Sequence, residues 1–224
     1  MKGNIGRVRV KPSLIVLAEL ALVLAVTYTL NFILPSSVKG LVLFLPVAYI
    51  LVDRRIRHRS WKELGIVRRG FVKGIVANWH LFIIVALVLQ ISIPSGAAFF
   101  WPDYLQHILS RLPWSLSAGI AAFLGFLLLT ALSTFLEELV FRGLIQERLS
   151  RVFPQAVAVV VASVLFRIIH WTPGNPIIVI ADISAVIVDG LFYGVIYLRS
   201  RSVLVSWVVH FADIVGLAML LLLI

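Results

Sequence analysis

The sequence predicts an all-α fold, a polytopic membrane bundle of about seven transmembrane helices. The composition indicates this first, because 61% of the 224 residues are hydrophobic and only 13% are charged. A soluble domain is about half apolar and about a quarter charged. The mean hydropathy of +1.06 is more than a soluble core of this size can bury. Apolar runs of transmembrane length recur along the chain, as a membrane bundle requires.

Seven apolar segments are the predicted spans. In chain order they cover residues 12–34, 38–52, 74–93, 116–141, 155–171, 176–198 and 202–223. The first is expected to be an uncleaved anchor, because its apolar stretch is too long for a signal peptide. The second has only about 15 residues, so it either re-enters the membrane or depends on its neighbours. The fourth is expected to continue as a helix to about Leu149.

The distribution of positive charge predicts how the chain is oriented. The net charge is +10, but the basic residues form short clusters between apolar runs, which argues for a membrane protein rather than a nucleic-acid-binding one. If the N-terminus is cytoplasmic, all but three of the 20 Lys and Arg residues fall on the inside, the exceptions being Lys39, Arg111 and Arg167. We therefore expect a multi-pass cell-membrane protein with a cytoplasmic N-terminus and an outside C-terminus.

Two connecting segments have distinctive compositions. The basic and aromatic segment 53–73 is expected to contact anionic lipid head groups rather than to form a specific site. The segment 94–115 combines three prolines with Phe99, Phe100 and Trp101, and we expect an interfacial cap there. The chain has no cysteine, which excludes a thiol nucleophile, a disulfide framework and thiolate metal ligands.

Ionisable residues inside the predicted spans are the candidates for function. A charged side chain at mid-bilayer costs about 2.5–3.5 kcal/mol on insertion scales, so such residues face the bundle interior and pair. The residues concerned are Glu19, Glu137, Glu138, Asp182, Asp189 and Asp213, joined by His170 and His210. For Asp182 and Asp189 the favoured interpretation is structural pairing with Arg167 or Arg199.

The fourth span ends with TFLEELVFRGLIQERL. Glu138 and Arg142 are four residues apart, so they share a helix face and can form an ion pair. Glu137 is rotated by about 100° from Glu138 and lacks that partner. A desolvated carboxylate of this kind is a plausible general base or acid. Taken alone, the motif is equally compatible with two glutamates that stabilise the end of a long helix.

The fifth and seventh spans each place a histidine among apolar residues. In SVLFRIIHW, Phe166 and His170 are four residues apart, so the Phe166 ring is expected to pack beside the imidazole. A lone histidine in an apolar helix is more often a hydrogen-bonded core residue than a catalyst. In SWVVHFADIVG, His210 and Asp213 share a face, either as a structural helix contact or as a buried functional pair. Glu137, His170 and His210 lie at different predicted depths, and can meet only if the fifth span is shifted, broken or re-entrant.

The ordered motifs EELVFR, FRIIH and HFAD resemble the CAAX protease and bacteriocin-processing family of intramembrane peptidases. That family includes the type II CAAX prenyl endopeptidases and abortive-infection-like proteins, and its pattern is EExxxR, FxxxH and a later His followed by Asn or Asp. The resemblance covers roughly residues 116–215 and extends weakly to SWKELGIVRRG. It implies that residues 116–224 form the catalytic core and that residues 1–115 contribute N-terminal membrane helices and a basic cytoplasmic loop.

The resemblance also implies roles for individual residues. Glu137 would activate the attacking water, His170 would help to hold it, and His210 would polarise the scissile carbonyl or stabilise its oxyanion. The supporting residues would be Glu138, Arg142 and Phe166.

One position departs from the family pattern. Where the family often has Asn, four residues after the last His, this chain has Ile214. Asp213 is the implied substitute, although a carboxylate donates no hydrogen bond unless it is protonated.

The cofactor and the substrate stay open at this stage. The cofactor is unknown. A divalent metal such as zinc could be held by Glu137, His170, His210 and Asp213, and the resemblance equally allows a glutamate-activated water without metal. Besides membrane lipid, the expected partner is a membrane-associated peptide or a prenylated protein: a prenylated C-terminus, a leader peptide or a membrane-bound propeptide. The alternatives to a peptidase are a small proton-coupled transporter and a non-catalytic membrane scaffold.

Overall fold

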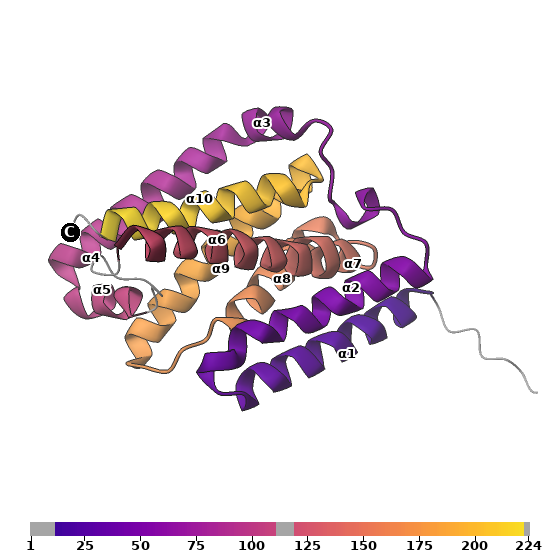
Figure 1. Cartoon of the computed structure of the whole chain (residues 1–224), viewed down its shortest axis with the longest axis horizontal. Helices are drawn as coiled ribbons and strands as arrows, with labels where there is room; N and C mark the ends of the chain where they lie inside the picture. The colour runs from indigo at the N-terminus through magenta and orange to yellow at the C-terminus, as the bar shows by residue number, and fades with distance from the viewer. Residues whose placement is uncertain (1–11, 111–118, 222–224) are drawn as a thin grey trace, which may run out of the picture.

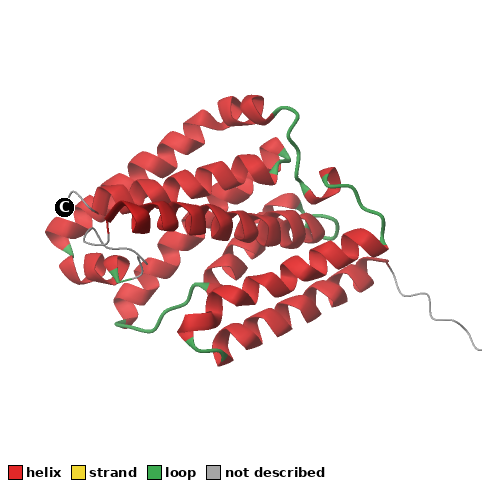
Figure 2. Ribbon diagram, viewed as in Figure 1, coloured by secondary structure: helices red, strands yellow, loops and turns green. Residues whose placement is uncertain are grey.

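The computed structural model describes residues 12–110 and 119–221, and the described chain is built from helices and their connections (Figures 1 and 2). The elements, in order, are α1 (Pro12–Ile33), η1 (Ser36–Leu43), α2 (Phe44–Ile56), η2 (Lys62–Leu64), α3 (Phe71–Ile84), η3 (Val85–Ser92), α4 (Ile93–Phe100), α5 (Pro102–Leu109), α6 (Gly119–Glu138), η5 (Leu139–Gln146), α7 (Glu147–Leu149), α8 (Gln155–Ile169), α9 (Pro176–Ser200) and α10 (Val203–Leu221). The elements η1 and η2 are 3₁₀-helices, whereas η3 and η5 are π-helical. The predicted all-α membrane fold is confirmed.

Five of the described helices are long and apolar enough to cross a membrane. They cover Leu14–Ile33, Phe71–Phe100, Gly119–Leu149, Pro176–Ser200 and Val203–Leu220. The predicted count of seven is not confirmed, because the other two segments form shorter helices. In the second segment η1 takes up the first residues and α2 has 13 residues. In the fifth, α8 has 15 residues, about 22 Å, which is less than the hydrocarbon thickness of about 30 Å.

The helices form a bundle around α9 and α10. The helix α10 packs against α6 and α9, and α8 packs against α9 and η5. The antiparallel pair α1 and α2 flanks the bundle on one side, and α3 lies along α10 on the other (Figure 1). As expected, the fourth segment continues as a helix to Leu149 through η5 and α7.

Close packing of α8 against α9 depends on two glycines. A Cβ added at Gly190 would stand 3.0 Å from the Cβ of Ser163, and one at Gly194 would stand 2.9 Å from Cγ1 of Val159. Small residues four apart allow two membrane helices to approach in this way. The backbone carbonyls of the same two glycines accept hydrogen bonds from Arg142 and Gln146 of η5.

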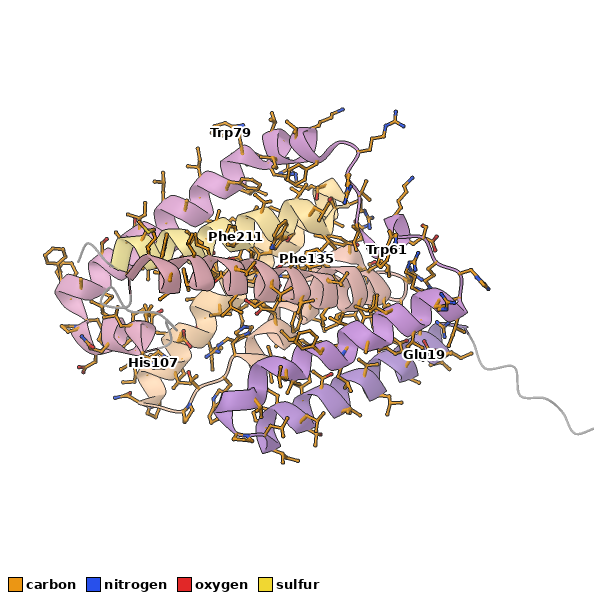
Figure 3. All side chains as sticks on the ribbon, viewed as in Figure 1. Glu19, Trp61, Trp79, His107, Phe135 and Phe211 are labelled. Carbon is orange, nitrogen blue, oxygen red and sulfur yellow. The ribbon has the colours of Figure 1, made fainter. Side chains whose placement is uncertain are left out.

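The two ends of the bundle differ in charge. At one end Arg148 is buried between Glu19, at 2.8 Å, and Asp53, at 3.0 Å. Figure 3 shows Glu19 and Trp61 at this end and His107 at the opposite one. The segment 53–73 is packed onto the bundle here, since the carbonyl of Gly65 accepts a 2.8 Å hydrogen bond from the backbone N–H of Val203.

The opposite end is formed by α4 and α5, within the segment predicted as an interfacial cap. Rather than an irregular loop, the described part of it is helical: α4 prolongs the third span to Phe100, and α5 folds back beside it. Phe99 and Phe100 are 82% and 90% exposed, as aromatic anchors at a membrane interface would be. Arg111 lies outside the described residues.

Candidate active site

Three of the predicted site residues meet in the middle of the bundle. Glu137 lies near the centre of the continuous helix from α6 to α7, two residues before the start of the π-helical segment η5 at Leu139. Its Oε2 atom is 3.7 Å from Nε2 of His170 and 3.7 Å from Nε2 of His210. The difference in depth that the sequence implied disappears because α8 is too short to cross the membrane, so that His170, directly after its last residue, lies in the interior of the bundle.

Local contacts orient His170. Its Nδ1 is 2.8 Å from the backbone carbonyl of Phe166, and its ring lies 4.6 Å from the Phe166 ring. The guanidinium of Arg167 donates to the backbone carbonyl of His170. Arg167 is held in turn by Asp182 of α9, at 2.6 Å, so the predicted pairing of these two residues is confirmed. Nε2 of His107, on α5, lies 3.5 Å from the same Asp182 oxygen.

Glu138 is the centre of a buried polar network. Its Oε2 lies 3.3 Å from Nε of Arg142, which confirms the predicted ion pair, and its Oε1 lies 3.0 Å from Nδ1 of His210. The hydroxyl of Ser206 donates to the same carboxylate. Arg142 also donates to the carbonyl of Gly190 at 3.1 Å. Glu138 and Arg142 are both fully buried, so each charge depends on the other and on these neighbours.

Asp213 does not join Glu137 and the two histidines. It accepts a hydrogen bond from the hydroxyl of Tyr193, whose ring stacks on His210 with the ring centres 4.5 Å apart. Asp213 lines a neighbouring apolar groove between η3 and α10, while the adjacent Ile214 faces the central cavity. The structure therefore places Asp213 behind His210 rather than beside the reacting groups.

The three converging side chains lie in the wall of a cavity of about 290 Å³. Its wall combines hydroxyl-bearing residues of α6 with apolar side chains of η3, α9 and α10. The polar lining residues are Gln90, Tyr104, Thr130, Ser133, Thr134, Asp182 and Asp189, besides Glu137, His170 and His210. Arg199, the other cation considered for Asp189, instead contacts His80 at 3.2 Å.

The donor atoms of the site are of the kinds that bind a metal ion. Two imidazole nitrogens and a carboxylate oxygen are the donor types of an open zinc site. Across residues 12–110 and 119–221, however, no group of three or more His, Asp or Glu side chains is arranged to hold an ion. The described residues therefore do not fit a metal centre as they stand.

Several supporting residues were not predicted from the sequence. Ser206 precedes His210 by four residues and therefore shares its helix face, a spacing that could have indicated it. The Gly190–Gly194 spacing could have indicated the close contact with α8. Nothing in the local sequence connects Tyr193 with Asp213 or His107 with Asp182, because each pair comes from different helices.

A helical membrane bundle that gathers a carboxylate and two imidazoles at an internal cavity is the arrangement expected of an intramembrane protease. A family comparison agrees: the model described as type II CAAX prenyl endopeptidase Rce1-like matches residues 117–213. Over this segment the chain is similar to the Rce1-like family, which confirms the resemblance drawn from the three motifs. Comparisons with curated proteins and with solved structures found no match.

Proposed function

We propose that the protein is an intramembrane endopeptidase in which Glu137 activates a water molecule for attack on a peptide bond. The observation that carries this proposal is the position of one Glu137 oxygen 3.7 Å from the Nε2 atoms of both His170 and His210. These separations are too long for direct hydrogen bonds, which end at about 3.2 Å. A water molecule, or the oxygen of a substrate, is proposed to lie on the cavity side of these atoms and to bridge them.

The partners of the imidazole Nδ1 atoms support distinct tasks for the two Nε2 atoms. Nδ1 of His170 faces a carbonyl oxygen, which only accepts, so Nδ1 carries the hydrogen. The neutral ring then presents a lone pair at Nε2 and can accept a hydrogen bond from the water. His210 lies between the carboxylates of Glu137 and Glu138, which together compensate the charge of a protonated ring.

The proposed reaction has two proton transfers. Glu137 takes a proton from the water as its oxygen attacks the carbonyl carbon, and Nε2–H of His210 donates to the oxyanion that forms. Glu137 then gives the proton to the leaving nitrogen as the C–N bond breaks. The products are a new carboxylic acid, which then loses its proton to solvent, and a new amine.

Asp213 is proposed as a positioning residue. It binds the hydroxyl of Tyr193, and the Tyr193 ring lies against the imidazole of His210. In this role Asp213 does not touch the substrate, so the absence of Asn at Ile214 removes no oxyanion donor that the mechanism needs. The substrate is proposed to be a membrane-associated peptide, and the family name adds prenylated C-termini to the candidates to be tested.

The experiment compares Glu137→Gln with wild type as purified full-length protein in lipid nanodiscs. The substrates are membrane-tethered peptides of three kinds: prenylated C-termini, leader peptides and apolar propeptides. We expect Glu137→Gln to lower the cleavage rate about 10²- to 10⁴-fold, the usual contribution of a general base. The matched control is Glu147→Gln, ten residues further along the same continuous helix, where the carboxylate pairs with Arg151 and Arg201 at the bundle end.

The same variants discriminate against a transporter. If Glu137 instead relays protons, Glu137→Gln abolishes a proton-coupled flux in proteoliposomes while wild type cleaves no peptide of the panel. Equal peptide cleavage by Glu137→Gln and wild type would also contradict the proposal.

A further inference from the structure

The cavity extends from the site in one direction along the bundle. On α6 its lining residues run from Glu137 back to Phe126, and on α10 they run from His210 forward to Leu217. On α9 they run back to Asp182. All three series lead to the same end of the bundle, where Tyr104 and Ile108 of α5 form part of the wall.

In the opposite direction the interior is filled. The next polar side chains beyond Glu137 are Glu138, Arg142 and Gln146, which are at most 2% exposed. Gln146 donates to the carbonyl of Gly194 at 3.0 Å, and Arg142 to that of Gly190. The apolar core around Phe141, Leu144 and Ile145 surrounds this region.

The filled end is the basic end. Twelve Lys and Arg residues of the described ranges gather there: Arg54, Arg55, Arg57, Arg59, Lys62, Arg68, Arg69, Lys73, Arg148, Arg151, Arg199 and Arg201. Ion pairs such as Arg148 with Asp53 and Arg201 with Glu147 connect these segments, so the segments lie at the same end of the bundle. Among the described residues of the connections at the cavity end, the one Lys or Arg is Lys39, between α1 and α2.

We propose that the cavity opens to the extracytoplasmic side of the membrane and that the protein cleaves a short apolar stretch of an exported or membrane-anchored protein there. Lys and Arg accumulate on the cytoplasmic side of membrane proteins, which assigns the filled end to the cytoplasm. A cavity of about 290 Å³ holds a short extended segment rather than a folded domain. The apolar wall residues Leu89, Ile93, Val186 and Leu217 suit an apolar chain.

This inference rests on the proposed peptidase function, and it selects among its substrates. A prenylated C-terminus of a cytoplasmic protein approaches from the filled, basic end. A leader or propeptide that has crossed the membrane approaches from the open end. The inference therefore favours a peptide on the outer side over a cytoplasmic prenylated protein.

The first part of the test uses the absence of cysteine in the chain, because single cysteines can be introduced without background. Gln106→Cys places a thiol on the exposed face of α5, Thr130→Cys places one in the cavity wall, and Lys62→Cys places one at the basic end. Right-side-out vesicles are treated with a small membrane-impermeant thiol reagent. We expect labelling of the first two variants in sealed vesicles and of Lys62→Cys only after permeabilisation.

Two results would overturn the inference. One is the inverse labelling pattern, and the other is a Thr130→Cys thiol that the reagent reaches only after permeabilisation or not at all.

The second part of the test tethers one cleavable peptide to a single-span anchor in either orientation. We expect cleavage of the peptide displayed outside and none of the peptide displayed inside; cleavage only inside refutes the substrate assignment. If neither peptide is cleaved although Thr130→Cys is labelled from outside, the peptidase function fails while the direction of the cavity stands.

Discussion

Substitution by Gln is predicted to affect the two adjacent glutamates differently: Glu138→Gln should lower the stability of the protein, and Glu137→Gln should lower its activity. Glu138 is fully buried and is shared by Arg142, His210 and Ser206, so Glu138→Gln leaves a buried guanidinium without its counter-charge. Glu137 has no Arg or Lys partner in the described ion pairs and borders the cavity. Glu137→Gln therefore removes the proposed base without breaking a buried ion pair.

The expected losses of stability follow from the burial of the Glu138–Arg142 ion pair. Removal of one partner of a buried ion pair costs about 3–5 kcal/mol. For a chain of about this size, each kcal/mol shifts the Tm by about 2–4 °C, so Glu138→Gln should melt about 6–20 °C below wild type. We expect Glu137→Gln to stay within about 1 kcal/mol of wild-type stability. The assay is thermal unfolding of the detergent-solubilised protein, followed by the fluorescence of its six tryptophans.

A double-mutant cycle separates the ion pair from other effects. In Glu138→Gln combined with Arg142→Gln both charges are gone, so the double variant should be more stable than the sum of the single losses implies, by about 0.5–3 kcal/mol. Additive losses would show that the two side chains do not interact. A Glu137→Gln protein that melts as low as Glu138→Gln would refute the division of roles between the glutamates.

Three further predictions concern packing, positioning and the metal question. Gly194→Ala, whose Cβ would stand 2.9 Å from a valine methyl of α8, should cost about 1–3 kcal/mol in thermal unfolding, whereas Gly125→Ala, with open space around it, should be neutral or stabilising. Arg167→Gln removes the hydrogen bond to the backbone carbonyl of His170, so kcat should fall about 10- to 100-fold with little change in KM. Arg167→Lys should retain part of the wild-type kcat. An equal loss of kcat in both variants would argue for a merely structural role of Arg167. Because the proposed base is a carboxylate, pretreatment with a chelator should leave the cleavage rate unchanged, and a loss restored by added zinc would contradict the mechanism.

The sequence indicated much of the site because helical spacing is a local property. Residues four apart must share a face, so the pairing of Glu138 with Arg142 followed from position alone. The rotation of about 100° per residue likewise separated Glu137 from that pair. The contact of Asp213 with Tyr193 was not predictable from spacing, because Tyr193 belongs to another helix.

The number of spans was predicted less well than the type of fold. Hydropathy locates apolar segments but not the residue at which a helix ends. The predicted fifth span continued to residue 171, whereas α8 ends at Ile169, where Arg167 binds the carbonyl of His170 and pairs with Asp182 of α9. Because α8 has only 15 residues and does not cross the membrane, its last turn lies inside the bundle, and His170 is at the level of Glu137.

Composition and spacing by themselves determined that the chain is a helical membrane protein with buried carboxylates and histidines, because the cost of placing such groups in lipid leaves few alternatives. They also determined which residues share a helix face. Only the tertiary structure decided that Glu137, His170 and His210 meet, that Asp213 stands behind them, and that the cavity leads to the end opposite the basic residues. Those facts depend on how α6, α8, α9 and α10 are set against one another in depth, and packing between distant helices, such as the contact of Gly194 with α8, fixes that depth.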